Sequence, residues 1–420
     1  MARSLVPDSG RQAPDDIPAY PMPRAQGCPL DPAPELRELQ ERTPLTRVRL
    51  WDGSTPWLVT RYADQRALLA DKRVSSDSSR DGFPHQSAAT KARRDQARSF
   101  IAMDDPEHAR LRRMVTGAFT VRRTQELRPA IARIANELID ALLAGDKPAD
   151  LVADFALPVP SLVICELLGV PYADHDFFQR SSKVLISRGA TPEEARQAQG
   201  ELLQYLEDLV GRKLADPGDD LLSRVGAEQV ATGAMTRREL AAMGVLLLVA
   251  GHETTANMIA LGTYTLLTHP DQLARVRAAS AADGTGDAAL IDSTVEELLR
   301  YLTITQTGRR RVALEDIEIG GQVIRAGEGI VIAGEIGNRD ASVFANPDTV
   351  DVAREGRRHV AFGFGVHQCL GQPLARAELQ VVYSTLYRRI PSLALAADPA
   401  DLPFKYDGLV YGLYELPVTW

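Results

Sequence analysis

The longest apolar segment of the chain lies near its middle, inside a helical pattern. Thr236-Arg-Arg-Glu239 has the spacing of a capping box, which predicts the start of a helix. His269-Pro270 predicts its end, because proline cannot continue a helix. The roughly 33 residues between these signals would form about 50 Å of helix, and the run at residues 246–251 is apolar on every side. We therefore expect a buried helix that crosses the whole domain.

Shorter patterns on either side predict a mainly α-helical protein with a smaller β part. Alternation at residues 46–51 and 57–61 flanks Asp52-Gly53, which predicts a β-hairpin. Residues 105–215 and 236–302 have helical patterns, whereas residues 309–332 and 407–420 form short β-type runs. Residues 74–97 predict a long surface loop that covers a binding site. We expect an irregular segment at residues 1–27 and a single domain at residues 28–420.

Composition and charge narrow the class of protein. The 420 residues are 45% apolar and carry a net charge of −8, so a large core is expected, and neither nucleic acid nor an anionic membrane is the expected partner. Three widely spaced cysteines do not form a disulfide framework. Residues 1–24 lack the apolar run of a signal peptide, and the longest nearly uncharged stretch, residues 240–252, is shorter than the ~20 residues that span a bilayer. We predict a soluble, cytoplasmic, monomeric protein without a membrane anchor.

A polar step interrupts the apolar middle of the long helix. Gly251 is followed by His252, Glu253 and Thr254, which place a carboxylate and a hydroxyl inside a core. Such departures from local consistency are typical of functional sites. Gly251 costs about 1 kcal/mol relative to alanine in a helix, and it would leave room for a ligand. The alternative is that Thr254 only bonds back to a helical carbonyl and bends the helix.

Cys369 lies between a glycine-rich loop and a helix that begins near residue 372. Gly363, Gly365 and Gly371 allow the backbone to turn tightly beside a flat ligand. The start of the following helix would favour the thiolate form of the cysteine. A thiolate in a glycine-lined pocket is either a ligand for a soft metal or a nucleophile, and the plain alternative is a buried structural cysteine.

Charged residues form two further groups. Glu297 and Arg300, three residues apart, share a helix face, which is weak evidence by itself. The second group consists of four cations that are far apart in the sequence. If the fold places them beside the thiolate, they would suit a ligand with two carboxylates. The four cations are His108, Arg112, Arg311 and His367.

These motifs together resemble the cytochrome P-450 superfamily of heme-thiolate monooxygenases, in particular its soluble bacterial members from secondary metabolism and xenobiotic oxidation. The oxygen-activation pattern A-G-x-[DE]-T is met at residues 250–254, and the pattern E-x-x-R at Glu297 and Arg300. The resemblance extends from about residue 28 to residue 420. The heme-binding pattern F-x-x-G-x-H-x-C-x-G is met by Phe362, Gly365, His367, Cys369 and Gly371.

The resemblance implies a role for each site residue. Cys369 would be the proximal ligand of a heme b iron, Phe362 would pack near the sulfur, and Gly365 would admit the porphyrin. Glu253 and Thr254 would manage proton delivery on the distal side. The heme propionates would be bound by His108, Arg112, Arg311 and His367.

Other residues follow from the same resemblance. Glu297 and Arg300 would be structural, with Arg339 or Arg354 as a third member of their ion pair. No role is assigned to Arg309 or Arg310. The distal pocket would include Leu246, Val249, Ala250 and Thr307. Its roof would be the loop at residues 74–97, the region of residues 186–190 and the tail at residues 406–411.

The expected activity is hydroxylation or epoxidation of a medium-to-large lipophilic small molecule with O2. The substrate would be a macrolide, polyketide or steroid-like molecule. Electrons would come from a ferredoxin and an NAD(P)H-dependent ferredoxin reductase, since the chain shows no flavin or nicotinamide domain. A basic patch would steer the ferredoxin; its residues are Arg110, Arg113, Arg357 and Arg358.

Two alternatives belong to other classes. One is a heme-thiolate sensor or binding protein without catalysis, which would not need the Glu253-Thr254 step. The other is a cysteine nucleophile or a Cys/His zinc protein. A zinc site needs several close ligands, and only His367 is near Cys369 in the sequence.

Overall fold

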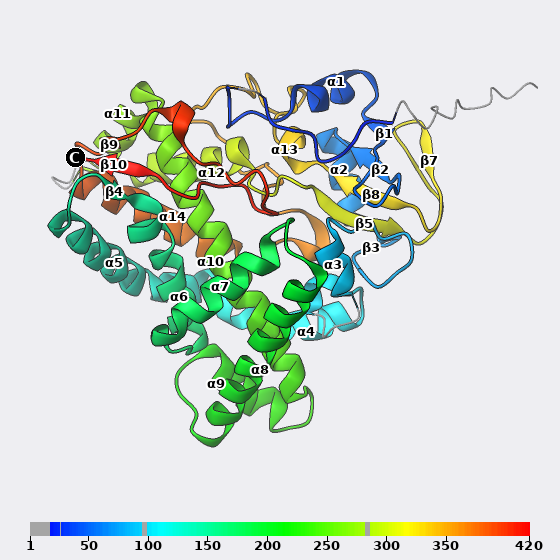
Figure 1. Ribbon diagram of the computed structural model, residues 1–420, viewed down its shortest axis with the longest axis horizontal. Coiled ribbons are helices and arrows are strands. Elements are labelled where there is room, and N and C mark those ends of the chain that lie inside the picture. Colours follow the sequence, from blue (N-terminus) through cyan, green and yellow to red (C-terminus); the bar gives the residue numbers. More distant parts are fainter. Residues whose placement is uncertain (1–16, 26, 95–98, 282–285) are drawn as a thin grey trace, which may run out of the picture.

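The computed structural model describes residues 17–25, 27–94, 99–281 and 286–420. Helices dominate the fold, as predicted (Figure 1). In chain order they are α1 (Pro34–Arg42), α2 (Tyr62–Ala70), α3 (Ala88–Ala92), α4 (Glu107–Thr116), α5 (Val121–Ala144), α6 (Pro158–Leu168), α7 (His175–Ile186), α8 (Pro192–Ala215), α9 (Leu221–Val225), α10 (Arg237–Leu267), α11 (Pro270–Ala279), α12 (Ala288–Leu302), α13 (Gly334–Gly337) and α14 (Gln372–Arg389).

The strands are short and lie mostly to one side of the helices (Figure 1). They are β1 (Leu45–Arg47), β2 (Trp57–Val59), β3 (Val74–Ser75), β4 (Ala149–Asp150), β5 (Arg309–Ala313), β6 (Ile317–Ile319), β7 (Gln322–Ile324), β8 (Gly329–Ile332), β9 (Ala394–Leu395) and β10 (Pro417–Thr419). The main sheet has the order β1-β2-β8-β5-β3, and β4-β10-β9 and β6-β7 form smaller sheets. The hairpin predicted around Asp52-Gly53 is the antiparallel pair β1-β2.

Helix α10 is the long central helix that the sequence predicts. The Thr236 side chain accepts from the Glu239 N–H and the Glu239 carboxylate accepts from the Thr236 N–H, which completes the capping box. The helix ends just before His269, and α11 starts at Pro270. By length and composition α10 is apolar enough to cross a membrane, yet 67% of its most apolar window is buried inside the protein. It packs against α6, α8 and α14 and runs through the middle of the molecule (Figure 1).

Helix α10 contributes to both large apolar clusters of the core. Its first half, residues 240–248, packs with α6 and α8, whereas residues 258–266 pack with α12 and α14. The polar step at residues 252–255 lies between these two halves. Because each half is anchored in its own cluster, the helix presents the polar step at a fixed position.

A buried ion pair joins α12 to the segment before the Cys369 loop. The guanidinium of Arg300 donates two hydrogen bonds of 2.8 Å to the Glu297 carboxylate, and neither side chain is exposed. The third member is Arg354, whose Nε lies 3.0 Å from Glu297 Oε2. Arg339 instead pairs with Asp348. The pair is therefore structural, with Arg354 as its partner.

Replacing Glu297 with Gln should destabilise the protein strongly. Arg300 would keep its buried positive charge without a counter-ion, and breaking a buried pair costs about 3–5 kcal/mol. Glu137→Gln is the matched control, because it removes one partner of the exposed Arg133–Glu137 pair, and such pairs are worth less than ~1 kcal/mol. Urea unfolding followed by circular dichroism measures both, and equal midpoints would contradict the structural role.

Candidate functional site

Cys369 lies in a closed loop between the 3₁₀ turn Gly365–His367 and α14. Its N–H donates to the Phe362 carbonyl at 2.9 Å, which holds the loop shut. The cysteine is exposed, although it lies in the interior of the fold, so its thiol borders an internal space. This accessibility rules out a packed structural cysteine.

In the protein alone, the protonated thiol form of Cys369 is favoured over the thiolate. Burial raises the pKa of the Cys369 thiol above its ordinary value. A backbone hydrogen bond from Gly371 lowers that pKa, as do the charges of Arg309, Arg112 and Arg376, but these effects are smaller than desolvation. The start of α14 does favour the thiolate, as expected, through the Gly371 hydrogen bond, but the loss of water outweighs this effect in the protein by itself.

At Gly365 and Gly251, contacts within the protein require glycine, in addition to the roles expected from the sequence. Gly365 has a φ of 73°, and a Cβ there would lie 2.2 Å from the Leu69 carbonyl oxygen. A Cβ on Gly251 would lie 2.9 Å from Cδ1 of Ile164 in α6. Gly365 thus permits contact with the end of α2, and Gly251 permits close packing of α10 on α6.

One stripe of α10 remains accessible inside the protein. Ala250 is exposed and Leu246, Val249 and Thr254 are half-buried, whereas most of the helix is buried. The Thr254 hydroxyl donates to the Ala250 carbonyl at 2.7 Å. The back-bond that we considered as an alternative role is therefore present, and the same hydroxyl is exposed to the internal space.

Glu253 is buried behind this stripe and is only 5% exposed. Asn257 Nδ2 donates to the Glu253 carbonyl at 2.7 Å and lies 3.4 Å from Glu253 Oε2. His252 Nε2 lies 3.5 Å from the other carboxylate oxygen. Burial lowers the pKa of Lys405, and the negative charge of Glu253 raises it. The Lys405 amine therefore lies near the Glu253 carboxylate. The carboxylate is thus surrounded by polar groups one residue from Thr254.

The fold brings the four predicted cations together at one edge of the space. The rings of His108 and His367 are 4.0 Å apart between centroids. His108 is 2% exposed; its Nδ1 lies 3.0 Å from Asp105, and its Nε2 has no hydrogen-bond partner among the described residues. Burial, then Arg311, His108 and Arg112, lower the pKa of His367 to about 3. The His367 ring is therefore neutral in the protein alone, and a ligand with two carboxylates would offset the positive field of Arg311 and Arg112 that lowers its pKa.

Arg309 belongs to the same cluster, although we assigned it no role from the sequence. In β5 it lies two residues from Arg311, so both side chains leave the same face of the strand. Its Nη2 donates to the Ala361 carbonyl in the Cys369 loop, and its Nη1 has no partner among the described residues. Burial lowers the Arg309 pKa and the Cys369 charge raises it. The period-two spacing from Arg311 was the signal that could have found it.

A cavity of about 580 Å³ lies over this region and is lined from both α10 and the Cys369 loop. Leu246, Val249 and Thr307 line it, and the exposed Ala250 lies next to Val249. The roof includes residues of the 76–94 segment together with Ile186, Leu409 and Val410.

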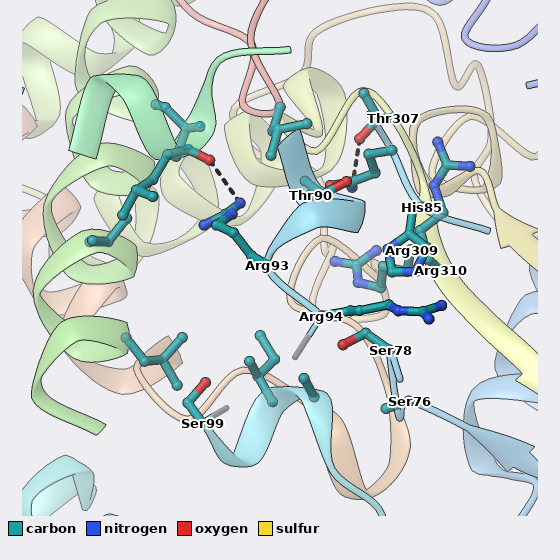
Figure 2. Close-up of a pocket in the computed structure, with 18 of the residues that line it drawn as sticks. Ser76, Ser78, His85, Thr90, Arg93, Arg94, Ser99, Thr307, Arg309 and Arg310 are labelled. Atoms are coloured by element: carbon teal, nitrogen blue, oxygen red, sulfur yellow. Dashed lines mark hydrogen bonds between the residues drawn. The ribbon is translucent and has the colours of Figure 1, made fainter. Parts of the chain in front are cut away.

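The cavity is more polar than we expected from the sequence. His85, Gln86, Arg93 and Arg94 all line it. Gln86 Nε2 donates to Thr307 Oγ1 at 2.9 Å, and Arg93 Nη2 donates to the Leu185 carbonyl at 3.2 Å. Figure 2 marks both bonds as dashed lines and shows the polar side chains among apolar ones. A ligand in this cavity meets apolar surface and hydrogen-bond donors together.

These features fit heme. An accessible thiol lies within reach of the charges of Arg309 and Arg112, and His108 leaves one ring nitrogen without a partner among the described residues. Arg309, Arg311 and His367 also line the cavity. Thiolate is an established axial ligand of heme iron, and propionates are natural partners for arginine. A zinc site lacks support, because within the described ranges no group of three or more His, Cys, Asp or Glu side chains is placed to bind a metal ion.

The comparisons with known proteins agree with this description. The family model of cytochrome P450 matches residues 211–390. Cytochrome P450 GfsF of Streptomyces halstedii is 56% identical over 422 residues, covering 100% of both chains. Cytochrome P450-SU2 of Streptomyces griseolus is 53% identical over 410 residues, covering 98% of this chain and 99% of its own. The crystal structure of GfsF has a TM-score of 0.88 and covers 96% of this chain and 100% of its own.

The fold and the site together define a heme-dependent oxidoreductase. The chain belongs to the cytochrome P450 family, and its fold is the single-domain fold of bacterial P450 structures. It is a bacterial-type monooxygenase with heme b as its cofactor. The alternative of a non-catalytic sensor is set aside, since relatives are named as monooxygenases and a synthase.

Replacing Arg309 with Gln should make heme dissociate about tenfold faster, roughly what the loss of one charge-assisted hydrogen bond costs. Transfer of heme to apomyoglobin measures the rate directly. Arg325→Gln is the matched control, because Arg325 is an exposed arginine that pairs with Asp316 at a distance from the cavity. Equal heme transfer from both variants would exclude Arg309 from the heme site.

Proposed function

We propose that this protein is a heme-thiolate monooxygenase in which Cys369 is the proximal ligand and the cavity above holds an oxygen-bearing lipophilic substrate. The observation that carries this proposal is the accessible Cys369 thiol in a closed interior loop, beside the cation cluster. Iron at the sulfur would supply the positive charge that offsets the cost of burying a thiolate. The bonds of the loop fix the position of the sulfur.

Heme b, when bound, supplies the activation of dioxygen and the transfer of one oxygen atom to the substrate. The side chains orient and retain it. Phe362 packs beside the loop of the sulfur, with the Arg376 guanidinium 4.6 Å from its ring centroid. Gly365 sets the path of the loop against α2. The propionates would be held by His108, Arg112, Arg311 and His367, and Arg309 would add a further positive charge.

Thr254 and Glu253 form the proton path from the interior to the distal side. The exposed Thr254 hydroxyl is fixed by its bond to Ala250, so its oxygen can accept a hydrogen bond from water or substrate in the cavity. The buried Glu253 lies next to it and is linked to Asn257 and His252. Glu253 takes protons from the polar surroundings and passes them toward Thr254.

The substrate is a macrolide or another polyketide of similar size. Leu246, Val249 and the neighbouring Ala250 would offer apolar contact to the substrate, and Thr307 also lines the cavity. The arginines of the roof suit hydroxyl and carbonyl oxygens of such a molecule. Two relatives support this class: one solved structure holds mycinamicin VIII and another holds filipin I. They are 41% and 40% identical to this chain.

Electrons come from a ferredoxin and its NAD(P)H-dependent reductase. The docking surface is narrower than the sequence suggested, because Arg110 already pairs with Glu107 at 2.8 Å and Glu239 at 2.7 Å. The exposed Arg113, Arg357 and Arg358 remain as the contact residues. Their positive charge would attract an acidic ferredoxin in spite of the net charge of −8. We place the protein in the cytoplasm as a monomer.

The reduced, carbon monoxide-bound absorption spectrum tests the thiolate ligand. The native protein should give a strongly red-shifted Soret band, and Cys369→Ala should lose it. Cys165→Ala is the control, since burial raises the pKa of the Cys165 thiol to about 12 and keeps it inert in the core. A colourless native protein, or a band that survives Cys369→Ala, would refute the assignment.

Replacing Thr254 with Ala should separate electron use from product formation. The product formed per NAD(P)H consumed should fall by about tenfold or more, since a positioned proton donor contributes at least that much, and hydrogen peroxide should rise. Thr265→Ala is a close control, because Thr265 makes the same 2.7 Å back-bond to Leu261 in a buried part of α10. Unchanged coupling in Thr254→Ala would remove this residue from the proton path.

A further inference from the structure

A second cavity, of about 550 Å³, lies between the N-terminal segment and the turn that follows α7. Two backbone bonds separate it from the heme cavity: Leu409 N–H to the Ile186 carbonyl at 2.8 Å, and Arg188 N–H to the Asp407 carbonyl at 2.9 Å. Ile186 and Leu409 line the heme cavity, whereas Arg188 lines the second one. The roof that we predicted from residues 186–190 and 406–411 thus divides two chambers, and Tyr406 faces the second.

One end of the second cavity carries hydrogen-bonding groups that the fold leaves unused. Glu335 is 5% exposed; its Oε1 accepts from the Tyr20 hydroxyl at 2.9 Å, and its Oε2 has no partner among the described residues. Arg24 directs Nη1 to backbone carbonyls, while its Nε and Nη2 have no partner there. Arg188 donates from Nη2 to the Tyr406 carbonyl and likewise leaves Nε unpaired in the described part of the chain.

The charge at this end is positive. Arg24 and Arg188 are opposed only by Glu335 among the described lining residues, and burial raises the pKa of Glu335 to about 7. Asp407 is not among the lining residues; it raises the pKa of Arg188 and accepts from the Tyr414 hydroxyl. Asp31 pairs with Arg339.

Most of the remaining lining is apolar and comes from the N-terminal segment and α1. The guanidinium of Arg24 lies 3.8 Å from the ring centroid of Tyr411, which helps to hold it in place. A ligand that fits this cavity has one anionic end and an apolar body. The apolar wall residues are Pro21, Met22, Pro23, Pro32, Ala33 and Leu36.

We propose that this second cavity is a ligand site, distinct from the heme cavity, that binds a small amphipathic carboxylic acid. The carboxylate lies between the unpaired N–H groups of Arg24 and Arg188, and Glu335 adds a donor or an acceptor. The hydrocarbon body lies on the apolar wall. Because no contact with heme or with the oxidised substrate is involved, the site stands or falls independently of the monooxygenase proposal.

Octanoate is a suitable probe, with octan-1-ol as its uncharged counterpart. In calorimetry on the heme-loaded protein, octanoate should bind when imidazole already occupies the heme iron, and the imidazole Soret spectrum should not change. Arg188→Gln should weaken octanoate binding by about tenfold, roughly the effect of one lost charge-assisted bond. Arg180→Gln, which changes an exposed arginine of α7, should bind as the native protein does.

Several results would overturn the proposal. They are the absence of octanoate binding, its loss when imidazole is bound, equal affinities in Arg188→Gln and Arg180→Gln, or equal binding of octan-1-ol. The carbon monoxide spectrum shows that each variant is folded and heme-loaded. Arg24→Lys supplies a second test that keeps the charge but removes the planar guanidinium, and it should weaken octanoate binding as well.

Discussion

The site depends on positive charge that the protein gathers around one thiol without neutralising it. Arg309, Arg112 and Arg376 all act on Cys369, and the first two belong to the same edge as His367 and Arg311. Burial and the neighbouring charges lower the pKa of His367 to about 3, so the protein alone avoids part of the repulsion by leaving this ring neutral. A cofactor that combines a metal ion with two carboxylates would balance both the thiolate and the remaining positive charges. The metal takes the thiolate, and the carboxylates take the cations.

Helix α10 connects this arrangement to the rest of the core. Each half of the helix is fixed in a separate apolar cluster, and Glu253 and Thr254 lie where the two clusters meet. A carboxylate there is tolerated because Asn257 and His252 surround it. The same rigidity explains Gly251, which lets α10 approach Ile164 of α6. Gly251, which the sequence suggested would leave room for a ligand, thus also allows the close packing that holds the helix in place.

The two chambers differ in how they combine polar and apolar surface. In the heme cavity, Arg93 and Gln86 are bonded to neighbouring protein groups, so the donors are placed before a substrate arrives. In the second cavity, Arg24 and Glu335 retain groups without partners in the described chain. Buried groups of that kind are costly unless something pairs with them. A family fold can therefore carry a further site wherever a loop leaves such groups beside an apolar wall, and family membership alone would not reveal it.

The sequence by itself determined the family, the long helix, the hairpin and the identity of the thiol, because these follow from local patterns: a capping box, an Asp-Gly turn and a fixed spacing of glycine, histidine and cysteine. It could not determine quantities that depend on distant neighbours. The choice of Arg354 over Arg339, the clash that requires Gly365 and the raised pKa of Cys369 all arise from contacts between residues far apart in the chain. Arg309 is intermediate: strand periodicity puts it on the same face as Arg311, but only the packing of β5 against the Cys369 loop brings its guanidinium to the site. Desolvation and packing are properties of the assembled structure, so only the tertiary fold decided them.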